Sequence, residues 1–259
     1  MSEALSNYRF QVAYDGRDFY GWQRLSDKPT IQGALEQAIT QVLGVRAAVH
    51  GSGRTDRGAH ALAQIASVRL PAHPRAELDA LAAELDAALP EAITLSELRQ
   101  VSDDFHACDS ALAKQYCYLI WDRQELPAER EGKVWHVREA LDADAMAAAC
   151  PLFVGRKDFA SFAKPPRHQQ KSTVRTVSSF TLEREGPELR LSIRADGFLY
   201  KMVRNIVRAL AKVGEGRTTL AQLEGIIAAR DRKSAPGTAP ASGLYLEQVF
   251  YAAEENETA

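Results

Sequence analysis

The spacing of apolar residues separates strands from helices in the first half of the chain. Every second position between Tyr8 and Tyr14 is apolar, which predicts a strand with one buried face. After Thr30, a residue suited to cap a helix, apolar positions recur every three or four residues until Gly44. The predicted elements of this half are strands at 8–14 and 63–70 and helices at 31–43 and from Leu78 to Pro90.

The second half shows the same two periods. Residues 174–182 and 189–195 alternate around a turn at 185–187, which predicts an antiparallel hairpin. Thr219 and Gln222 have the spacing of a helix capping box. The other predicted elements are strands at 116–121 and 244–251, a helix from Asp142 that Pro151 ends, and a helix at 201–213. The pattern predicts an α+β fold with halves at 1–105 and 106–259.

The composition fits an ordinary globular protein, with 46% hydrophobic and 25% charged residues. Its three cysteines (Cys108, Cys117 and Cys150) form no Cys-x-x-Cys pair, so we expect neither a disulfide framework nor a cysteine-rich zinc site. No apolar run has the length that crosses a bilayer, and the first ten residues do not resemble a signal peptide. We therefore expect a cytoplasmic protein without a membrane partner.

Charge is unevenly distributed along the chain. The net charge of −2 alone argues against a polyanionic partner, because phosphate binding depends on Lys and Arg. Residues 164–176, however, contain Lys164, Arg167, Lys171 and Arg175 and no acid, whereas residues 77–97 contain acids and no base. Such segregation suits a protein that binds nucleic acid on one side.

The loop 51–58, of sequence GSGRTDRG, is the strongest candidate for chemistry. Its three glycines allow close backbone approach to a ligand, and Arg54 and Arg57 flank the single carboxylate of Asp56. An ionised, partly exposed Asp can act as a nucleophile or a base. The alternative is a turn in which Asp56 caps its own backbone. The loop lacks the Gly-Lys-[Ser/Thr] ending of a phosphate-binding P-loop.

Other residues admit both a functional and a structural interpretation. His50 and His60 near Asp56 match no metal-ligand spacing, so we interpret them as structural. Tyr116 and Tyr118 point to the same face of a strand, either into the core or toward a stacked base. Segment 14–24, which ends at Arg24, mixes aromatics with cations and suits either RNA contact or a loop over the core.

One side of the predicted helix 201–213 is cationic. Lys201, Arg204, Arg208 and Lys212 follow one another at spacings of three and four residues. They predict either a solvated helix face or a set of phosphate contacts in which Arg204 pairs with a carboxylate.

Taken together, these segments resemble the tRNA pseudouridine synthase A family. The matching segments, in the order of the family, are 14–16 through 21–23, 53–61, 104–107, 116–118, 159–162, Phe198 with 202–207, and 243–246. The resemblance implies two similar α/β halves that share a long, mostly antiparallel sheet with a central basic cleft, and a homodimer. It also implies isomerisation of uridine to pseudouridine in the anticodon stem-loop of tRNA, at positions 38 to 40, without metal or organic cofactor.

The resemblance also assigns roles to residues. Asp56 would be the catalytic aspartate, Tyr116 the tyrosine beside the base, and Arg204 the arginine that pairs with the carboxylate. Arg54 would help to hold the opened RNA, and Leu244 would supply an apolar wall. Further RNA contacts are expected from Arg24, Lys201 and Arg208.

The chain departs from the family pattern in four places. Cys108 and Asp109 stand where Arg and an apolar residue are usual, Asp86 replaces Asn, and Lys114 replaces Arg. These changes bear on RNA affinity and target range more than on the reaction. Two rival functions are a non-catalytic RNA-binding protein, with Asp56 as a turn residue, and a pseudouridine synthase for another RNA.

Overall fold

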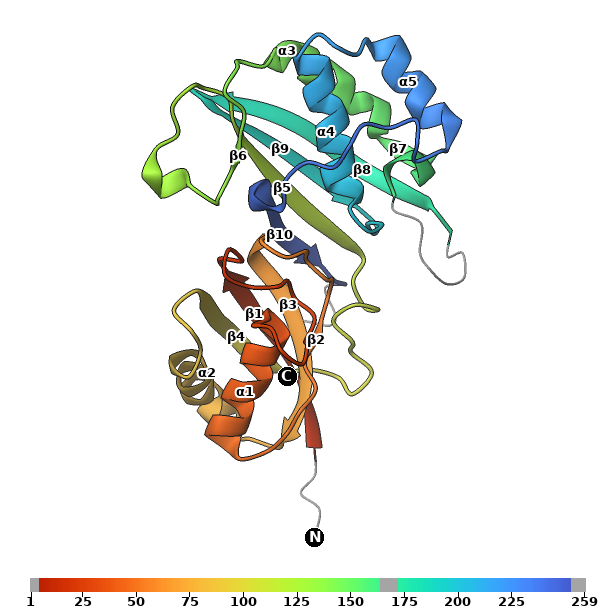
Figure 1. Cartoon of the computed structure of the whole chain (residues 1–259). Helices are drawn as coiled ribbons and strands as arrows, with labels where there is room; N and C mark the ends of the chain where they lie inside the picture. Colours follow the sequence, from red (N-terminus) through yellow and green to blue (C-terminus); the bar gives the residue numbers. More distant parts are fainter. Residues whose placement is uncertain (1–4, 164–171, 253–259) are drawn as a thin grey trace. The chain divides into compact units, whose positions relative to one another are not determined.

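The computed structural model describes residues 5–163 and 172–252. The chain divides into two compact units, one made of residues 1–112 and 246–259 and the other of 113–245 (Figure 1). The predicted division at 105/106 placed all of the last strand in the second half. In the structure most of that strand belongs to the first unit, because the chain returns there after Tyr245.

The first unit is built on strands that lie side by side. Its strands lie in the order β4 (Ile93–Gln100), β1 (Leu5–Tyr14), β3 (His60–Pro71) and β10 (Leu244–Phe250), and the short β2 (His50–Gly51) pairs with β3. β1 runs antiparallel to both β3 and β4. α1 (Ile31–Leu43) lies next to α2 (Leu78–Ala87), which packs along β4 (Figure 1).

The ends of α1 follow the sequence signals. The Thr30 side chain accepts a hydrogen bond from the Gly33 amide at 3.3 Å. Gly44 ends the helix in the left-handed conformation, with φ 70°, which glycine adopts without steric cost. Leu35 and Ile39 are fully buried, so the apolar face of the helix packs on the sheet as predicted.

β4 was not predicted, and a bulge explains why. Arg9 pairs with Arg99 but Gln11 pairs with Ser96, so β4 has one extra residue at this point. Glu97 adopts φ 52° there. A bulge breaks the period of two, and the alternation that identifies a strand is lost.

β1 is buried on more than the one face predicted for it. Arg9 is only 6% exposed and its guanidinium lies over the rings of Phe105 and Tyr251. Asn7 donates hydrogen bonds to the carbonyls of Ser102 and Phe105, both at 2.8 Å. The polar face of this strand is therefore covered by the segment after β4 and by Tyr251.

The strands of the second unit also lie side by side. Its strands lie in the order β5 (Ala113–Trp121), β9 (Glu188–Ala195), β8 (Val174–Glu185) and β7 (Gly155–Asp158), all antiparallel, and β6 (Trp135–His136) runs parallel to β5. The register pairs Tyr116 with Ile193 and Tyr118 with Leu191. Paired residues share a face, so both tyrosines lie on the apolar face of β9.

Three helices complete the second unit. They are α3 (Ala143–Ala149), α4 (Met202–Gly214) and α5 (Leu220–Ala229) (Figure 1). Asp142 caps α3, and the predicted capping box of Thr219 and Gln222 opens α5. α3 packs on β8 and against α4, where a Cβ on Gly214 would approach the Met146 sulfur to 2.6 Å.

Short 3₁₀ turns join the main elements. They lie at Arg75–Glu77, Ala128–Arg130, Cys150–Phe153, Ala160–Phe162 and Ala241–Gly243. Among the described residues, no helix is both long and apolar enough to cross a membrane. The structure confirms the predicted α+β class.

Candidate active site

The loop between β2 and β3 carries Asp56, and its base is fixed to the sheet. The Ser52 amide donates to the Ile65 carbonyl at 2.8 Å, and the Gln64 side chain donates to the Gly53 carbonyl at 2.7 Å. Further along, the hydroxyls of Thr55 and Tyr14 are 2.8 Å apart. Burial raises the pKa of Tyr14, so this buried hydroxyl stays neutral.

A second loop, residues 15–22, packs directly against the Asp56 loop. A Cβ on Gly16 would lie 1.9 Å from the Ala59 carbonyl oxygen, and one on Gly21 would lie 2.6 Å from that of Thr55. Gly21 also has φ 95°. The Trp22 amide donates to the Thr55 carbonyl at 3.2 Å. The two loops thus contact each other through backbone, at positions where only glycine fits.

Asp56 itself lies in a turn and is half-buried. Its carbonyl accepts a hydrogen bond from the Ala59 amide at 3.1 Å, and Gly58 adopts φ 76°. The backbone is therefore a turn, as the non-catalytic interpretation expected. The residue keeps partial access to solvent, which a catalytic role requires, and Arg54 nearby is exposed.

His60 is a structural residue, as predicted. It is 2% exposed, and its Nδ1 accepts a hydrogen bond from the Gly16 amide at 3.2 Å. The same nitrogen lies 3.2 Å from a carboxylate oxygen of Asp15. Burial opposes ionisation of Asp15, but hydrogen bonds from the side chain and amide of Arg17, together with its charge, outweigh burial and lower the pKa of Asp15. Within residues 5–163 and 172–252, no group of three His, Cys, Asp or Glu residues has metal-site geometry.

In the second unit, Tyr116 and Tyr118 are both buried. Tyr116 is 7% exposed and meets the Phe198 ring edge-on, with ring centroids 4.9 Å apart. Tyr118 donates its hydroxyl to the Pro240 carbonyl at 2.7 Å, and burial raises its pKa. The core interpretation therefore holds for Tyr118, while Tyr116 lies at the end of the buried row beside an aromatic partner.

Arg204 on α4 is fixed to the segment that follows α5. Its Nε donates to the Ala239 carbonyl at 2.8 Å, and the Ala239 amide donates to the Arg204 carbonyl at 3.1 Å. Its neighbour Asn205 is 1% exposed and donates to the Phe162 carbonyl at 2.6 Å. The Asn205 carbonyl oxygen accepts from Thr238 at 2.7 Å and from Arg232 at 3.3 Å.

The remaining cations of α4 have partners. Arg208 lies over the Trp135 ring at 5.3 Å and 3.5 Å from Glu215, which also pairs with Lys212. Lys201 precedes the helix with φ 62°, and its ammonium lies over the Tyr200 ring at 5.3 Å. These contacts contradict a simple solvated face, because most of the cations pack against rings or a carboxylate.

Two predicted RNA contacts have structural roles in their own units. Arg24 pairs with Glu36 of α1 while its side chain stays 63% exposed. Leu244 is buried at the start of β10, directly after Gly243. A Cβ on Gly243 would lie 2.6 Å from the Leu119 carbonyl oxygen, so this glycine lets the segment approach β5 closely.

The predicted site residues are divided between the units. The first unit holds Arg24, Arg54 and Asp56. The second unit holds Tyr116, Lys201, Arg204, Arg208 and Leu244. Each unit therefore holds part of the predicted site. That Asp56, Tyr116 and Arg204 come together in one site stays a prediction.

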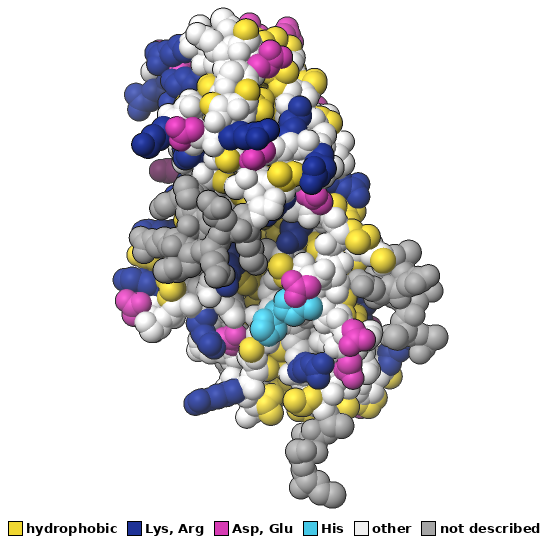
Figure 2. All heavy atoms as spheres, turned by 90° about the vertical axis from the view of Figure 1, so that its right-hand side faces the viewer, with side chains coloured by type: hydrophobic (Ala, Val, Ile, Leu, Met, Phe, Trp, Pro, Cys, Tyr) yellow, Lys and Arg dark blue, Asp and Glu magenta, His cyan; other side chains and the backbone are white. Residues whose placement is uncertain are grey.

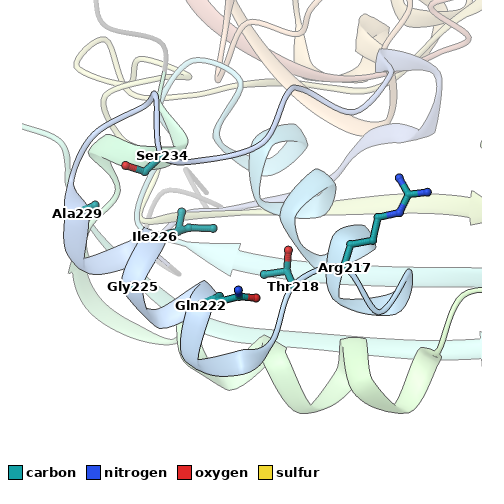
Figure 3. Close-up of a pocket in the computed structure, with 7 residues that line it drawn as sticks. All are labelled: Arg217, Thr218, Gln222, Gly225, Ile226, Ala229 and Ser234. Carbon is teal, nitrogen blue, oxygen red and sulfur yellow. The ribbon is translucent and has the colours of Figure 1, made fainter.

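A shallow pocket of about 470 Å³ lies beside α5 in the second unit (Figure 3). Its lining residues are Arg217, Thr218, Gln222, Gly225, Ile226, Ala229 and Ser234. The predicted site residues are not among them, so we do not assign the reaction to this pocket.

The basic segment that suggested nucleic-acid binding is described only in part. Lys164, Arg167 and Lys171 lie outside the described residues. Arg175 donates to the carbonyls of Ser172 and Val174. On the face shown in Figure 2, basic side chains are frequent and acidic ones lie among them.

The departures from the family pattern also find places in the structure. The Asp86 carboxylate accepts a hydrogen bond from the Leu95 amide at 2.7 Å, which an Asn carbonyl oxygen could accept equally well. Asp109 lies 3.2 Å from Nδ1 of His106, and Cys108 is exposed. The Asp86 change therefore conserves a structural bond.

Sequence analysis missed the tertiary roles of several residues. Gly16 and Gly21 were noted as parts of a segment, but their contacts with the Asp56 loop join positions distant in the chain. Asn205 was considered only as the neighbour of Arg204, although it connects three segments of the second unit. Its polar side chain among the apolar positions of α4 was the available signal.

Comparison with known proteins identifies the family. The family described as tRNA pseudouridine synthase matches residues 11–108 and 149–252. The tRNA pseudouridine synthase A of Rhodospirillum centenum is 42% identical over 248 residues, which cover 95% of this chain and all of that protein. The protein of the same name from Rhodospirillum rubrum is 43% identical over 96% of this chain and 89% of its own length. The chain therefore belongs to the tRNA pseudouridine synthase family.

Proposed function

We propose that this protein isomerises uridine to pseudouridine in the anticodon stem-loop of tRNA, with Asp56 as the catalytic carboxylate. The observation that carries the proposal is the Asp56 loop, a half-buried carboxylate on backbone fixed both to the sheet and to the loop 15–22. Family membership supplies the reaction class.

The reaction explains why a fixed carboxylate is useful. The uridine must leave its stack, the bond between N1 and the ribose breaks, the uracil turns, and C5 forms the new bond and loses its proton. Asp56 acts either as a nucleophile on the nucleoside or as a base that starts elimination at the ribose. In both routes a carboxylate held in place lowers the cost of orienting the reacting groups.

The second unit supplies the other groups in this proposal. Tyr116 packs on the uracil and helps to remove the C5 proton, and Arg204 pairs with Asp56. The bond from Arg204 Nε to the Ala239 carbonyl supports this role, because it fixes the guanidinium while leaving other N–H groups of the side chain for a carboxylate. Arg54 holds the opened RNA, and Arg24, Lys201 and Arg208 contact its backbone.

We also propose that the active form is a homodimer in the cytoplasm. Both expectations come from the family resemblance. Sedimentation at low micromolar concentration tests the dimer, and a monomeric mass would contradict it.

The deciding experiment must separate the proposed function from two alternative functions. A non-catalytic RNA-binding protein would leave tRNA unmodified, and a related synthase would modify another RNA. Carbodiimide labelling and reverse transcription of RNA, from cells with and without the gene, map pseudouridines in every RNA class. We expect signals at the anticodon stem-loop of tRNA to disappear without the gene. Unchanged tRNA with lost signals elsewhere would contradict the proposed substrate.

A further inference from the structure

The ring of Tyr20 carries two cations next to the Asp56 loop. The Arg57 guanidinium lies over this ring at 4.1 Å, and the Lys28 ammonium lies over it at 5.3 Å. Arg57 and Lys28 are both exposed, and Tyr20 is half-buried. Arg57 directly follows Asp56 in the chain.

The backbone around this ring is fixed. The Tyr20 amide donates to the Pro29 carbonyl at 2.8 Å, and the Gly58 amide donates to the Phe19 carbonyl at 3.3 Å. A Cβ on Gly21 would lie 3.1 Å from the backbone nitrogen of Arg57, so the two loops are in close backbone contact here. The backbone of Arg57 is therefore held by the same loop contacts as that of Asp56, and its guanidinium lies on the Tyr20 ring.

Among the described residues, no ion pair involves either Arg57 or Lys28. The Tyr20 ring is the partner that both share. Two cations near one ring repel each other, and an anion between or beside them would remove that cost. A guanidinium stacked on an aromatic ring keeps its N–H edges available for phosphate oxygens.

We infer that Arg57 and Lys28, held on the ring of Tyr20, form a phosphate-binding site for the RNA backbone beside the nucleotide on which Asp56 acts. The inference deepens the proposed function and rests on it. Arg57 and Lys28 bind phosphate in this account, and Tyr20 is a positioning residue that acts through them.

The test measures tRNA affinity by filter binding over a range of salt concentrations, together with turnover at saturating tRNA. Arg57→Ala and Lys28→Ala should each weaken binding by about three- to tenfold and lower the slope of log K against log salt by about one. Turnover at saturating tRNA should fall less than the affinity does, because neither substitution removes the carboxylate of Asp56. Arg46→Ala is the matched control, since Arg46 is an exposed arginine of the same unit.

Tyr20→Leu separates positioning from charge. It keeps both cations, so the salt slope should stay near the parent value while affinity falls by about threefold, because the freed side chains must be ordered on binding. A salt slope for Arg57→Ala and Lys28→Ala equal to that of Arg46→Ala would overturn the inference. A loss of thermal stability with an unchanged salt slope would also overturn it, because the ring contacts would then be structural.

Failure of the phosphate-site inference and failure of the proposed function give different results. Asp56→Asn reports on the reaction and should leave tRNA binding intact. If Asp56→Asn kept its turnover, the catalytic assignment would fail while the salt slopes would still report on the phosphate site.

Discussion

The two units position their candidate groups by different means. In the first unit, Gly16 and Gly21 bring one loop so close to another that backbone touches backbone around Asp56. In the second unit, side chains of Asn205, Arg204 and Tyr118 reach across to hold segment 238–240 through hydrogen bonds. The first arrangement depends on glycines, which have no side chain, and the second depends on side chains that form hydrogen bonds. Substitutions should therefore damage the two units through opposite mechanisms, a clash in one and a lost bond in the other.

The largest effect is expected for Gly16→Ala. The added methyl would lie 1.9 Å from the Ala59 carbonyl oxygen, and backbone cannot yield as a flexible side chain can. We expect a loss of roughly 3 kcal/mol or more in the free energy of unfolding, measured by urea denaturation.

Gly225→Ala is the matched control. Gly225 lies within α5, and a Cβ there meets no described atom within 4 Å. This variant should gain about 0.5–1 kcal/mol, since alanine is the better helix former. Equal free energies of unfolding for Gly16→Ala and Gly225→Ala would contradict the claim that close backbone contact positions the Asp56 loop.

Asn205→Ala tests the other side of the comparison. It removes the donor to the Phe162 carbonyl and the acceptor for Thr238 and Arg232, in a place where water is excluded. We expect a loss of about 2–3 kcal/mol on urea denaturation, because buried polar groups lose their partners.

Gln222→Ala serves as the control in the same unit. Its side chain accepts a hydrogen bond from the Thr219 amide at the exposed start of α5. Loss of one capping bond should cost about 1 kcal/mol or less. If Asn205→Ala were as stable as Gln222→Ala, the buried hydrogen-bond hub would not hold the second unit together.

The sequence predicted best what neighbouring residues determine. Thr30 with Gly33, and Thr219 with Gln222, are local pairs, and both helix starts are confirmed. The 174–195 hairpin is also confirmed, because its turn and both alternating strands adjoin one another in the chain. β4 was missed because its bulge at Glu97 erases the alternation.

The parts of the site that were not predicted depend on long-range contacts. The fit of Gly16 against Ala59 and the hydrogen bonds of Asn205 exist only once distant segments have folded together. Asp56 could be proposed because glycines and arginines surround it in sequence and because its segment resembles the family. Its supporting loop carries no local signal of that role.

The smallest stability effect concerns the two buried tyrosines, one in each unit. Burial raises the pKa of Tyr14 and Tyr118 above the value of about 10 that tyrosine has in the unfolded chain. Above pH 10 the unfolded chain releases these protons and the folded protein keeps them, so stability is full below pH 10 and falls as pH rises further.

The measurement is the free energy of unfolding between about pH 9 and pH 11. Tyr118→Phe should lose about 1 kcal/mol at neutral pH, because the Pro240 carbonyl loses its donor, and should show a weaker decline above pH 10. Tyr200→Phe is the control, since Tyr200 is 55% exposed. An identical pH profile for Tyr118→Phe and Tyr200→Phe would contradict the account of Tyr118.

The most direct test of the central claim is tritium release from C5-labelled uridine in a tRNA transcript, with Asp56→Asn compared with the parent protein. The substitution keeps the size of the side chain and removes its charge, so the loop should fold normally and tRNA binding should be retained. We expect the parent protein to release tritium and Asp56→Asn to release none above background. Appreciable turnover by Asp56→Asn would contradict the assignment of Asp56 as the catalytic carboxylate.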